Sequence, residues 1–199
     1  MATAAAAAVA ILGMTGLVSC QSSGGKPQTV QKPDTIVAPA IGTLAIGGPL
    51  QEKGAVIGKL SGSLAGGAIG NYLERQDRDR NAAVIAAGYL PEQGEVLKVE
   101  SVETSPAAAR RGEIVNLTST YTILTPKNRP MTIRETREVR YRGSLVANPF
   151  IDVQRTNGTF TSTLPITLPR SAKPGAYEVT TTVSKDQRMA RSMTNFTIQ

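Results

Sequence analysis

Cys20 is the only thiol of the chain, and the sequence contains no histidine. Because histidine is the commonest metal ligand and a frequent general base, most hydrolytic and metal-dependent chemistry lacks its usual residue here. The sequence also has no Gly-x-Ser-x-Gly elbow and no P-loop, and no pair of carboxylates stands out by its setting. We therefore expect no enzyme, no cofactor and no metal site, which leaves the chemistry of Cys20 itself.

The segment before Cys20 is typical of a targeting sequence. Residues 4–17 are uncharged and apolar or small, and this run is too short to span a bilayer as a helix. Leu17-Val18-Ser19-Cys20 resembles the lipobox of bacterial lipoproteins. The resemblance implies a signal peptide over residues 1–19, cleavage before Cys20 and a diacylglycerol on its thiol. No Lys or Arg precedes Cys20, which departs from that family, and the alternative is an incidental or buried cysteine.

Residues 20–34 then read as a lipidated tether. They are rich in Ser, Gly, Gln, Lys and Pro and show no sustained periodicity, as is typical of a flexible linker. Gln21 stands where enterobacterial lipoproteins retained at the inner membrane carry Asp. By resemblance to that sorting rule, we expect an outer-membrane lipoprotein whose C-terminal part faces the periplasm or the cell surface.

Five glycines recur at a strict spacing of four residues: Gly54, Gly58, Gly62, Gly66 and Gly70. Each interior glycine costs a helix about 0.5–1 kcal/mol relative to alanine, so a helix here needs a second backbone packed against its smooth face. A bilayer favours such packing, and residues 54–73 would span roughly 30 Å as a helix. With the apolar stretch over residues 35–50, the pattern predicts a glycine-zipper membrane hairpin over residues 35–80.

This region is similar to the glycine-zipper two-transmembrane region of outer-membrane lipoproteins and of the rickettsial surface-antigen family. The resemblance lies in the glycine period and in the run Gly70-Asn71-Tyr72-Leu73-Glu74-Arg75-Gln76-Asp77. It implies close helix packing and self-association in the membrane. Lys59, Ser61 and Ser63 make the segment more polar than a typical spanning helix. The alternatives are a zipper that self-associates in the periplasm or at the membrane surface and a flexible Gly/Ala-rich spacer.

The sequence of residues 81–94 predicts a short helix, which Gly88 and Pro91 end, followed by a linker. From residue 95 to 199, short alternating runs of Val, Ile, Thr and Tyr are separated by turn residues, which is typical of an all-β domain. We expect seven strands, at residues 96–104, 114–124, 131–142, 150–155, 159–168, 175–184 and 189–198. This number and spacing predict an immunoglobulin-like β-sandwich.

Two turn features refine this expectation. Asn157-Gly158 predicts a tight hairpin between the strands on either side of it. Lys173-Pro174-Gly175-Ala176-Tyr177 resembles a step found in bacterial Ig-like and fibronectin-like modules. The resemblance implies a tyrosine corner, in which the Tyr177 hydroxyl binds nearby backbone.

The strand over residues 131–142 places its arginines on one face. Arg134, Arg140 and Arg142 share parity, and such a patch suits an anionic ligand: phosphate-bearing lipopolysaccharide, anionic lipid or peptidoglycan. The alternative is a solvated outer face that blocks edge pairing. Glu135 and Arg137 share the inward parity of Ile133, Val139 and Tyr141, which indicates a bulge, a pairing with neighbouring residues or a different register.

Two function classes remain open. The first is a structural envelope lipoprotein, in which acylated Cys20 binds membrane lipid and the glycine zipper packs or oligomerises. The second is a binding module, in which the sandwich recognises an envelope protein, a glycan or a secretion-system partner. The net charge of +7 does not indicate nucleic-acid binding, because the basic residues are not interleaved with aromatic ones.

Overall fold

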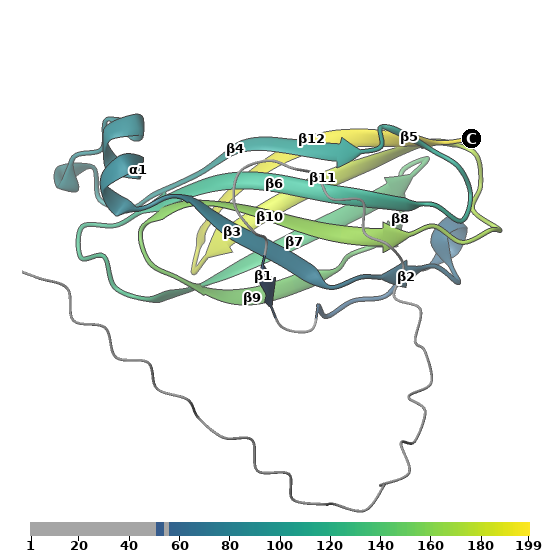
Figure 1. Cartoon of the computed structure of the whole chain (residues 1–199), viewed down its shortest axis with the longest axis horizontal. Coiled ribbons are helices and arrows are strands. Elements are labelled where there is room, and N and C mark those ends of the chain that lie inside the picture. Colours follow the sequence, from purple (N-terminus) through teal and green to yellow (C-terminus); the bar gives the residue numbers. More distant parts are fainter. Residues whose placement is uncertain (1–50, 54–55) are drawn as a thin grey trace, which may run out of the picture. The chain divides into compact units, whose positions relative to one another are not determined.

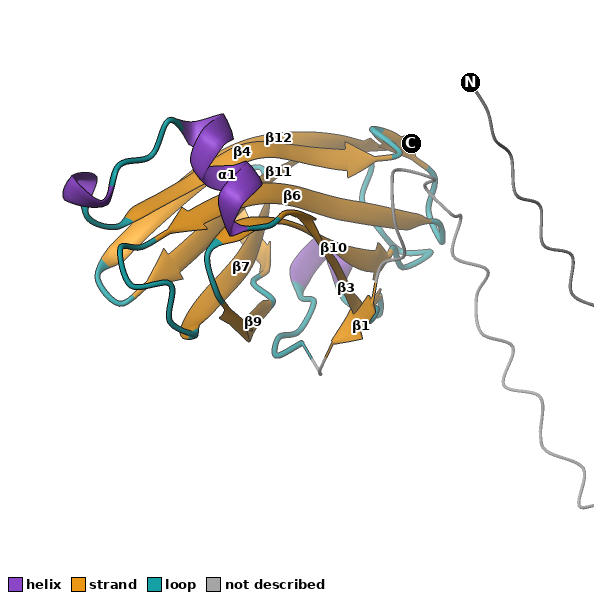
Figure 2. Cartoon of the chain, turned by 60° about the vertical axis from the view of Figure 1, so that its left-hand side comes forward, coloured by secondary structure: helices purple, strands orange, loops and turns teal. Residues whose placement is uncertain are grey.

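Alternating buried and exposed side chains along the long strands create two sheets that pack face to face. The computed structural model describes residues 51–53 and 56–199. These residues form a β-sandwich, with α1 at one end of the strands and the C-terminus at the other (Figure 1). Figure 2 shows the same strands in orange, with the purple helix α1 lying across them.

The first sheet has the order β1-β3-β10-β6-β4, and β2 also pairs with β10. Its strands are β1 (Gln51–Lys53), β2 (Ala68–Ile69), β3 (Tyr72–Arg78), β4 (Val96–Ser105), β6 (Ile114–Leu124) and β10 (Gly158–Thr167).

The second sheet has the order β5-β12-β11-β7-β8, and β9 also pairs with β7. Its strands are β5 (Ala108–Ala109), β7 (Met131–Tyr141), β8 (Ser144–Ala147), β9 (Phe150–Arg155), β11 (Gly175–Lys185) and β12 (Arg188–Ile198). Among the described strand pairs, only β5 on β12 is parallel. Three short helical elements complete the fold: η1 (Gly62–Leu64), α1 (Arg80–Ala87) and η2 (Pro91–Gln93).

The seven predicted strands are confirmed, and together they establish the sandwich. The strands over residues 114–124 and 150–155 match β6 and β9 from end to end, and each of the others ends within about one residue of its prediction. The period-2 pattern succeeded because each long strand has one face against the core.

The predicted tyrosine corner is also present. The Tyr177 hydroxyl donates to the backbone oxygen of Lys173 at 2.8 Å. The Tyr177 ring is buried between Tyr141 and Phe196, with ring centroids 4.7 and 5.1 Å away. This aromatic stack fixes the start of β11 against the interior.

The hairpin predicted at Asn157-Gly158 is wrong, because its flanking strands belong to different sheets. β9 pairs with β7, whereas β10 pairs with β6 and β3. The Asn157 side chain accepts from the Thr125 backbone N–H at 3.0 Å and donates to the Thr125 carbonyl at 2.7 Å. Asn157 therefore ties the crossing between sheets to the β6–β7 loop.

The predicted glycine-zipper helix over residues 54–73 is wrong for the described residues 56–73, which enter the sandwich as extended and turning backbone. The Ile57 and Phe150 backbones exchange hydrogen bonds of 2.8 and 2.9 Å, and the Gly70 N–H donates to Pro165 at 2.8 Å. Leu64 is fully buried in the core. Gly54 and the segment 35–50 lie outside the described residues.

The glycines allow this backbone path through positive φ angles and close contacts, and a spacing of four residues predicts neither. Gly62 and Gly66 have φ values of +55° and +86°, a region that side-chain-bearing residues seldom adopt. A Cβ on Gly58 would lie 2.6 Å from the Pro149 Cα. Within the described part of the chain, no helix is long and apolar enough to cross a membrane.

The N-terminal boundary of the sandwich differs from the predicted one at residue 95. Residues 51–53 and 68–78 supply β1, β2 and β3, so the sandwich begins well before residue 95. The predicted short helix after residue 80 is α1. Asp79 caps its N-terminus, where the carboxylate accepts from the Ala82 N–H at 2.8 Å, and Gly88 caps its C-terminus with φ +56°. This helix is an excursion between strands of one sheet rather than a linker between domains.

Gly67→Ala tests the path of this segment. Its new Cβ would lie 2.5 Å from the Thr167 carbonyl oxygen and 2.7 Å from the Leu60 Cδ1, so we expect the free energy of unfolding to fall by about 1–3 kcal/mol. In a helix the same change would add stability of about 1 kcal/mol. Urea denaturation of the chain from Gln21 onward measures the difference, with exposed Lys59→Ala as the control that stays close to wild type. A Gly67→Ala protein at least as stable as wild type would contradict the structure.

Candidate functional site

A cluster of charged and hydroxyl side chains lies between the two sheets. We call it the buried charge network, and its members are Tyr72, Glu74, Ser119, Tyr121, Glu135, Arg137, Arg155 and Ser162. Glu135 and Arg137 are on β7 and point inward, as their parity indicates. Their register is therefore the predicted one, and the interior supplies their partners.

Glu135 is the centre of the buried charge network. Its Oε1 accepts from the Tyr72 and Tyr121 hydroxyls, each at 2.6 Å. Its Oε2 accepts from the Ser162 hydroxyl at 2.6 Å and from Arg137 Nη2 at 3.2 Å. The side chain is 0% exposed, so each bond forms away from competing water.

Two arginines balance the two buried carboxylates. Arg137 Nη2 also donates to Ser119 Oγ and Ser162 Oγ, each at 2.7 Å. Arg155 donates through Nη2 to the Glu74 carboxylate and through Nε to the Tyr121 hydroxyl at 2.9 Å. Its guanidinium also lies 4.7 Å from the centroid of the Phe160 ring. Two negative and two positive side chains therefore leave the interior neutral.

The pKa directions follow from this geometry. Burial alone raises the pKa of Glu135, but Arg137 and the hydroxyls of Ser162, Tyr121 and Tyr72 outweigh it and hold that pKa below the ordinary 4.5. Burial and the adjacent Glu135 raise the pKa values of Tyr72 and Tyr121 above 10.0. Both tyrosines remain protonated donors at neutral pH, and Glu135 remains a charged acceptor.

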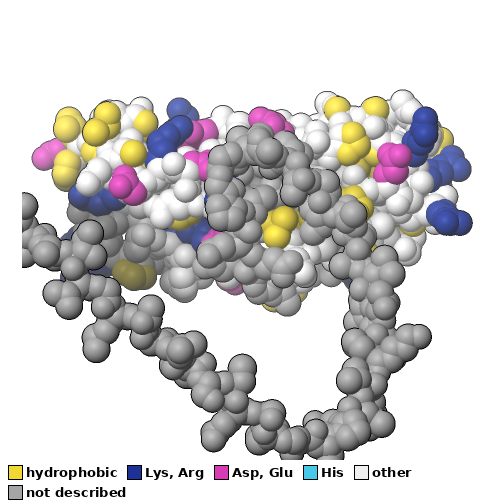
Figure 3. All heavy atoms as spheres, in the orientation of Figure 1, with side chains coloured by type: hydrophobic (Ala, Val, Ile, Leu, Met, Phe, Trp, Pro, Cys, Tyr) yellow, Lys and Arg dark blue, Asp and Glu magenta, His cyan; other side chains and the backbone are white. Residues whose placement is uncertain are grey.

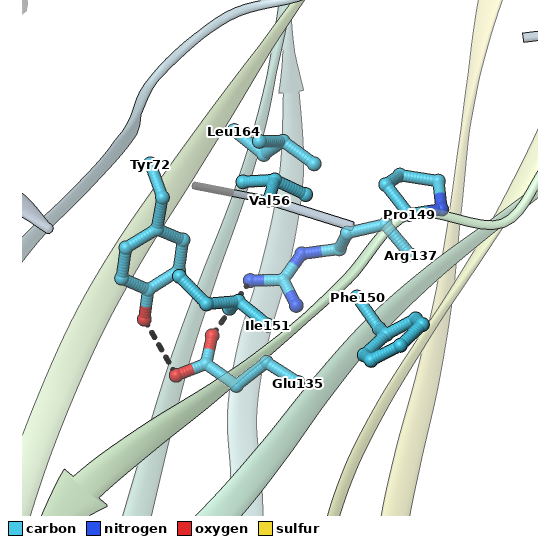
Figure 4. A pocket seen from close by; sticks show the side chains of 8 residues that line it. All are labelled: Val56, Tyr72, Glu135, Arg137, Pro149, Phe150, Ile151 and Leu164. Atoms are coloured by element: carbon cyan, nitrogen blue, oxygen red, sulfur yellow. Dashed lines mark hydrogen bonds and ion pairs between the residues drawn. The ribbon is translucent and has the colours of Figure 1, made fainter. Parts of the chain in front are cut away.

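A small hollow borders the buried charge network (Figure 4). It is lined by Val56, Tyr72, Glu135, Arg137, Pro149, Phe150, Ile151 and Leu164. Arg137 Nε is buried and has no hydrogen-bond partner among the described residues. The hollow has room for roughly one water molecule, which is too little for an organic substrate. The buried charge network therefore acts as a set of contacts that hold the two sheets together.

The predicted arginine patch is divided by ion pairs. Arg134 forms two 2.8 Å hydrogen bonds with Asp152 on β9. Arg140 donates to Glu138 at 2.6 Å and to the Gly143 carbonyl at 2.9 Å, and Arg142 lies over the Tyr141 ring at 5.2 Å. Two of the three guanidiniums are therefore already paired within the protein. These arginines do not block an edge, because β7 lies between β11 on one side and β8 and β9 on the other.

The other predicted site residues are placed differently. Gly58, Gly62, Gly66 and Gly70 line the entry to β3, and Cys20 and Gly54 lie outside the described residues. The part of the chain that the structure describes contains no cluster of His, Cys, Asp and Glu that could hold a metal ion.

Sequence reasoning missed two groups. Arg155 shares inward parity with Ile151 and Val153 on β9, which is a signal in the sequence. Tyr72 and Glu74 lie in the predicted membrane hairpin over residues 35–80, where no pattern places them in a sandwich. The second group is four exposed cations on the loops at the C-terminal end of the sandwich: Arg110, Arg111, Arg170 and Lys173. We call this group the basic loop end.

No known family profile and no curated protein match the chain. Among solved structures, an alkylpurine DNA glycosylase of Pseudomonas fluorescens is similar over 52% of this chain and 30% of its own, with 18% identity and a TM-score of 0.41. The CARDB domain of a Pyrococcus furiosus protein is similar over 56% of this chain and 94% of its own, with 12% identity and a TM-score of 0.40.

A β-glucosidase of Listeria innocua is similar over 52% of this chain and 16% of its own, with 12% identity and a TM-score of 0.36. The chain thus covers less than a third of the glycosylase and of this β-glucosidase. Likenesses of this size carry no information about function.

Arg155→Met should lower the free energy of unfolding by about 3–5 kcal/mol, because it leaves Glu74 and Glu135 buried with too little positive charge. Arg134→Met makes the same substitution in an exposed ion pair, and we expect it to change stability little. Urea denaturation of both variants gives the comparison. Equal small losses would contradict a structural role for the buried charge network.

Acid should destabilise the sandwich through Glu135. Because its folded pKa lies below the ordinary 4.5, Glu135 adds stability above pH 4.5, and this contribution is lost as the pH falls through the folded pKa. Glu135→Gln should be less stable at neutral pH and should lose less stability on acidification. Denaturation at a series of pH values measures both slopes, with exposed Glu103→Gln as the matched control. An unchanged acid slope in Glu135→Gln would refute this assignment.

Proposed function

We propose that this chain is a lipid-anchored binding module of the bacterial cell envelope. Cys20 carries the acyl anchor, the following segment is a tether, and the sandwich is the part that meets a partner. The proposed location is the outer membrane, with the sandwich in the periplasm or at the cell surface. An immunoglobulin-like classification belongs to the proposal and is supported by the long antiparallel strands and the Tyr177 corner.

A binding role at the surface is supported mainly by the filled interior of the sandwich. Its charges are matched within the buried charge network, and the adjoining hollow suits about one water molecule. Binding at exposed loops is the common use of a rigid sandwich of this kind. Loops at the C-terminal end carry cations that form no ion pair among the described residues: Arg110, Arg111, Arg170 and Lys173.

The glycine segment favours a binding module over a structural membrane element. Residues 56–78 contribute backbone hydrogen bonds and core side chains to the sandwich. A helix that packs in the membrane would have to withdraw Tyr72 and Glu74 from their buried partners. The proposal therefore assigns the membrane attachment to Cys20.

Cys20→Ser tests the anchor. Wild type expressed in a bacterial host should yield a mature chain that begins at Cys20 and carries the mass of its acyl groups, and it should fractionate with membranes. Cys20→Ser should lack that mass and keep its N-terminal segment, because the acceptor thiol is gone. Intact mass spectrometry with membrane fractionation reads both properties.

Ser22→Ala, two residues beyond the cysteine, is the control and should be processed as wild type. A wild-type chain that is soluble and carries no lipid mass would overturn the proposed anchor.

A further inference from the structure

Two loops at the C-terminal end of the sandwich bring four cations together. Residues 110–113 join β5 to β6, and residues 168–174 join β10 to β11. The Leu168 N–H donates to the Glu113 carbonyl at 2.8 Å, so the loops are hydrogen-bonded to each other. Figure 3 shows dark blue Lys and Arg side chains at this end, and others toward the opposite end.

The loops are held by buried anchors and by backbone bonds. Ala109, Leu168 and Ala172 are each 1% exposed. The Lys173 carbonyl accepts from the Tyr177 hydroxyl at 2.8 Å, and the Pro174 carbonyl accepts from the Tyr141 hydroxyl at 3.0 Å. The four cationic side chains take no part in these bonds, so they extend from a fixed platform.

The charge of this end is unbalanced. Arg110, Arg111, Arg170 and Lys173 against Glu113 give the two loops a net charge of 4 − 1 = +3. The Glu113 carboxylate accepts from the Arg110 backbone N–H at 2.7 Å, and none of the four cations forms an ion pair with a described residue.

Loops at the opposite end are nearly neutral. Residues 79–95, 125–130 and 186–187 hold three cations against four carboxylates, a net charge of 3 − 4 = −1: Arg80, Lys127 and Arg129 against Asp79, Glu92, Glu95 and Asp186. The two loops at the C-terminal end are therefore more positively charged than the loops at the opposite end.

We propose that the basic loop end docks on the anionic headgroups of the membrane that bears the chain. Four cations on two adjoining loops can meet several phosphates at once, and long Lys and Arg stems adapt to a surface of mobile headgroups. Each cation near an anionic bilayer adds roughly fivefold to the affinity, which is about 1 kcal/mol. This inference rests on the proposed anchor at Cys20, because the anchor keeps the sandwich within reach of the bilayer.

The test uses the chain from Gln21 onward, which lacks Cys20 and contains the whole sandwich of residues 51–53 and 56–199. It should co-sediment with vesicles of phosphatidylglycerol and phosphatidylcholine, not with phosphatidylcholine alone, and added salt should weaken binding. Replacing Arg110, Arg111, Arg170 and Lys173 with Gln should reduce the affinity at least about a hundredfold.

A matched control removes the same number of charges elsewhere. Lys127→Gln, Arg129→Gln, Arg188→Gln and Arg191→Gln together change exposed residues at or near the opposite end, and we expect this protein to keep most of its affinity. Circular dichroism checks that both proteins stay folded. We expect them to, because the loop bonds come from backbone atoms, tyrosine hydroxyls and the Glu113 carboxylate, which the substitutions leave in place.

Three results would overturn the inference. They are no binding to anionic vesicles, equal losses in the two quadruple variants, and binding to heparin that is as strong as binding to vesicles and as dependent on the four cations. The first two exclude a docking role for this end, and the third assigns it to soluble polyanions. Because the assay needs no acyl group, its failure leaves the proposed anchor intact, and failure of the Cys20 experiment leaves the vesicle result readable.

Discussion

Four charged side chains lie between the sheets, and the rest of the fold depends on their mutual neutralisation. Removing one ion from water costs several kcal/mol, so Glu74, Glu135, Arg137 and Arg155 are compatible with the interior only as a set. Their partners come from β3, β6, β7, β9 and β10. The buried charge network therefore fixes the register of strands in both sheets, because a slip of one residue would turn each side chain to the opposite face.

This constraint also decides where the glycine segment belongs. Tyr72 and Glu74 reach Glu135 and Arg155 only if β3 lies beside β10, and β3 lies there because residues 56–71 approach along β8, β9 and the end of β10. The approach is close, because a Cβ at Gly58 would collide with Pro149 and a Cβ at Gly67 would collide with the Thr167 carbonyl oxygen. On the surface, ion pairs divide the outer face of β7, and the four cations of the basic loop end form no ion pair with a described residue.

The sandwich could be predicted from the sequence because its signals are local. Val, Ile and Thr alternate along β6, β7 and β11, and Tyr177 stands just after its Pro-Gly turn. Gly58, Gly62, Gly66 and Gly70 could not be placed this way, since glycine permits close approach in a helix pair and in a turning strand alike. The helix pair and the turning strand differ in what packs against the glycines. Here the packing residues are Pro149 and Pro165, more than 80 residues away along the chain. The Arg134 partner, Asp152, is likewise invisible until β9 is paired with β7.

β3 and the glycine segment belong to the folded sandwich. Amide hydrogen exchange tests this placement directly, on the acylated protein in vesicles and on the chain from Gln21 onward in solution. The placement predicts that the amides of residues 72–78 bonded to β10 exchange as slowly as those of β6 and β10, and do so equally in both preparations. Protection over residues 56–73 that appears only in vesicles, while β6 and β10 remain protected in solution, would contradict it.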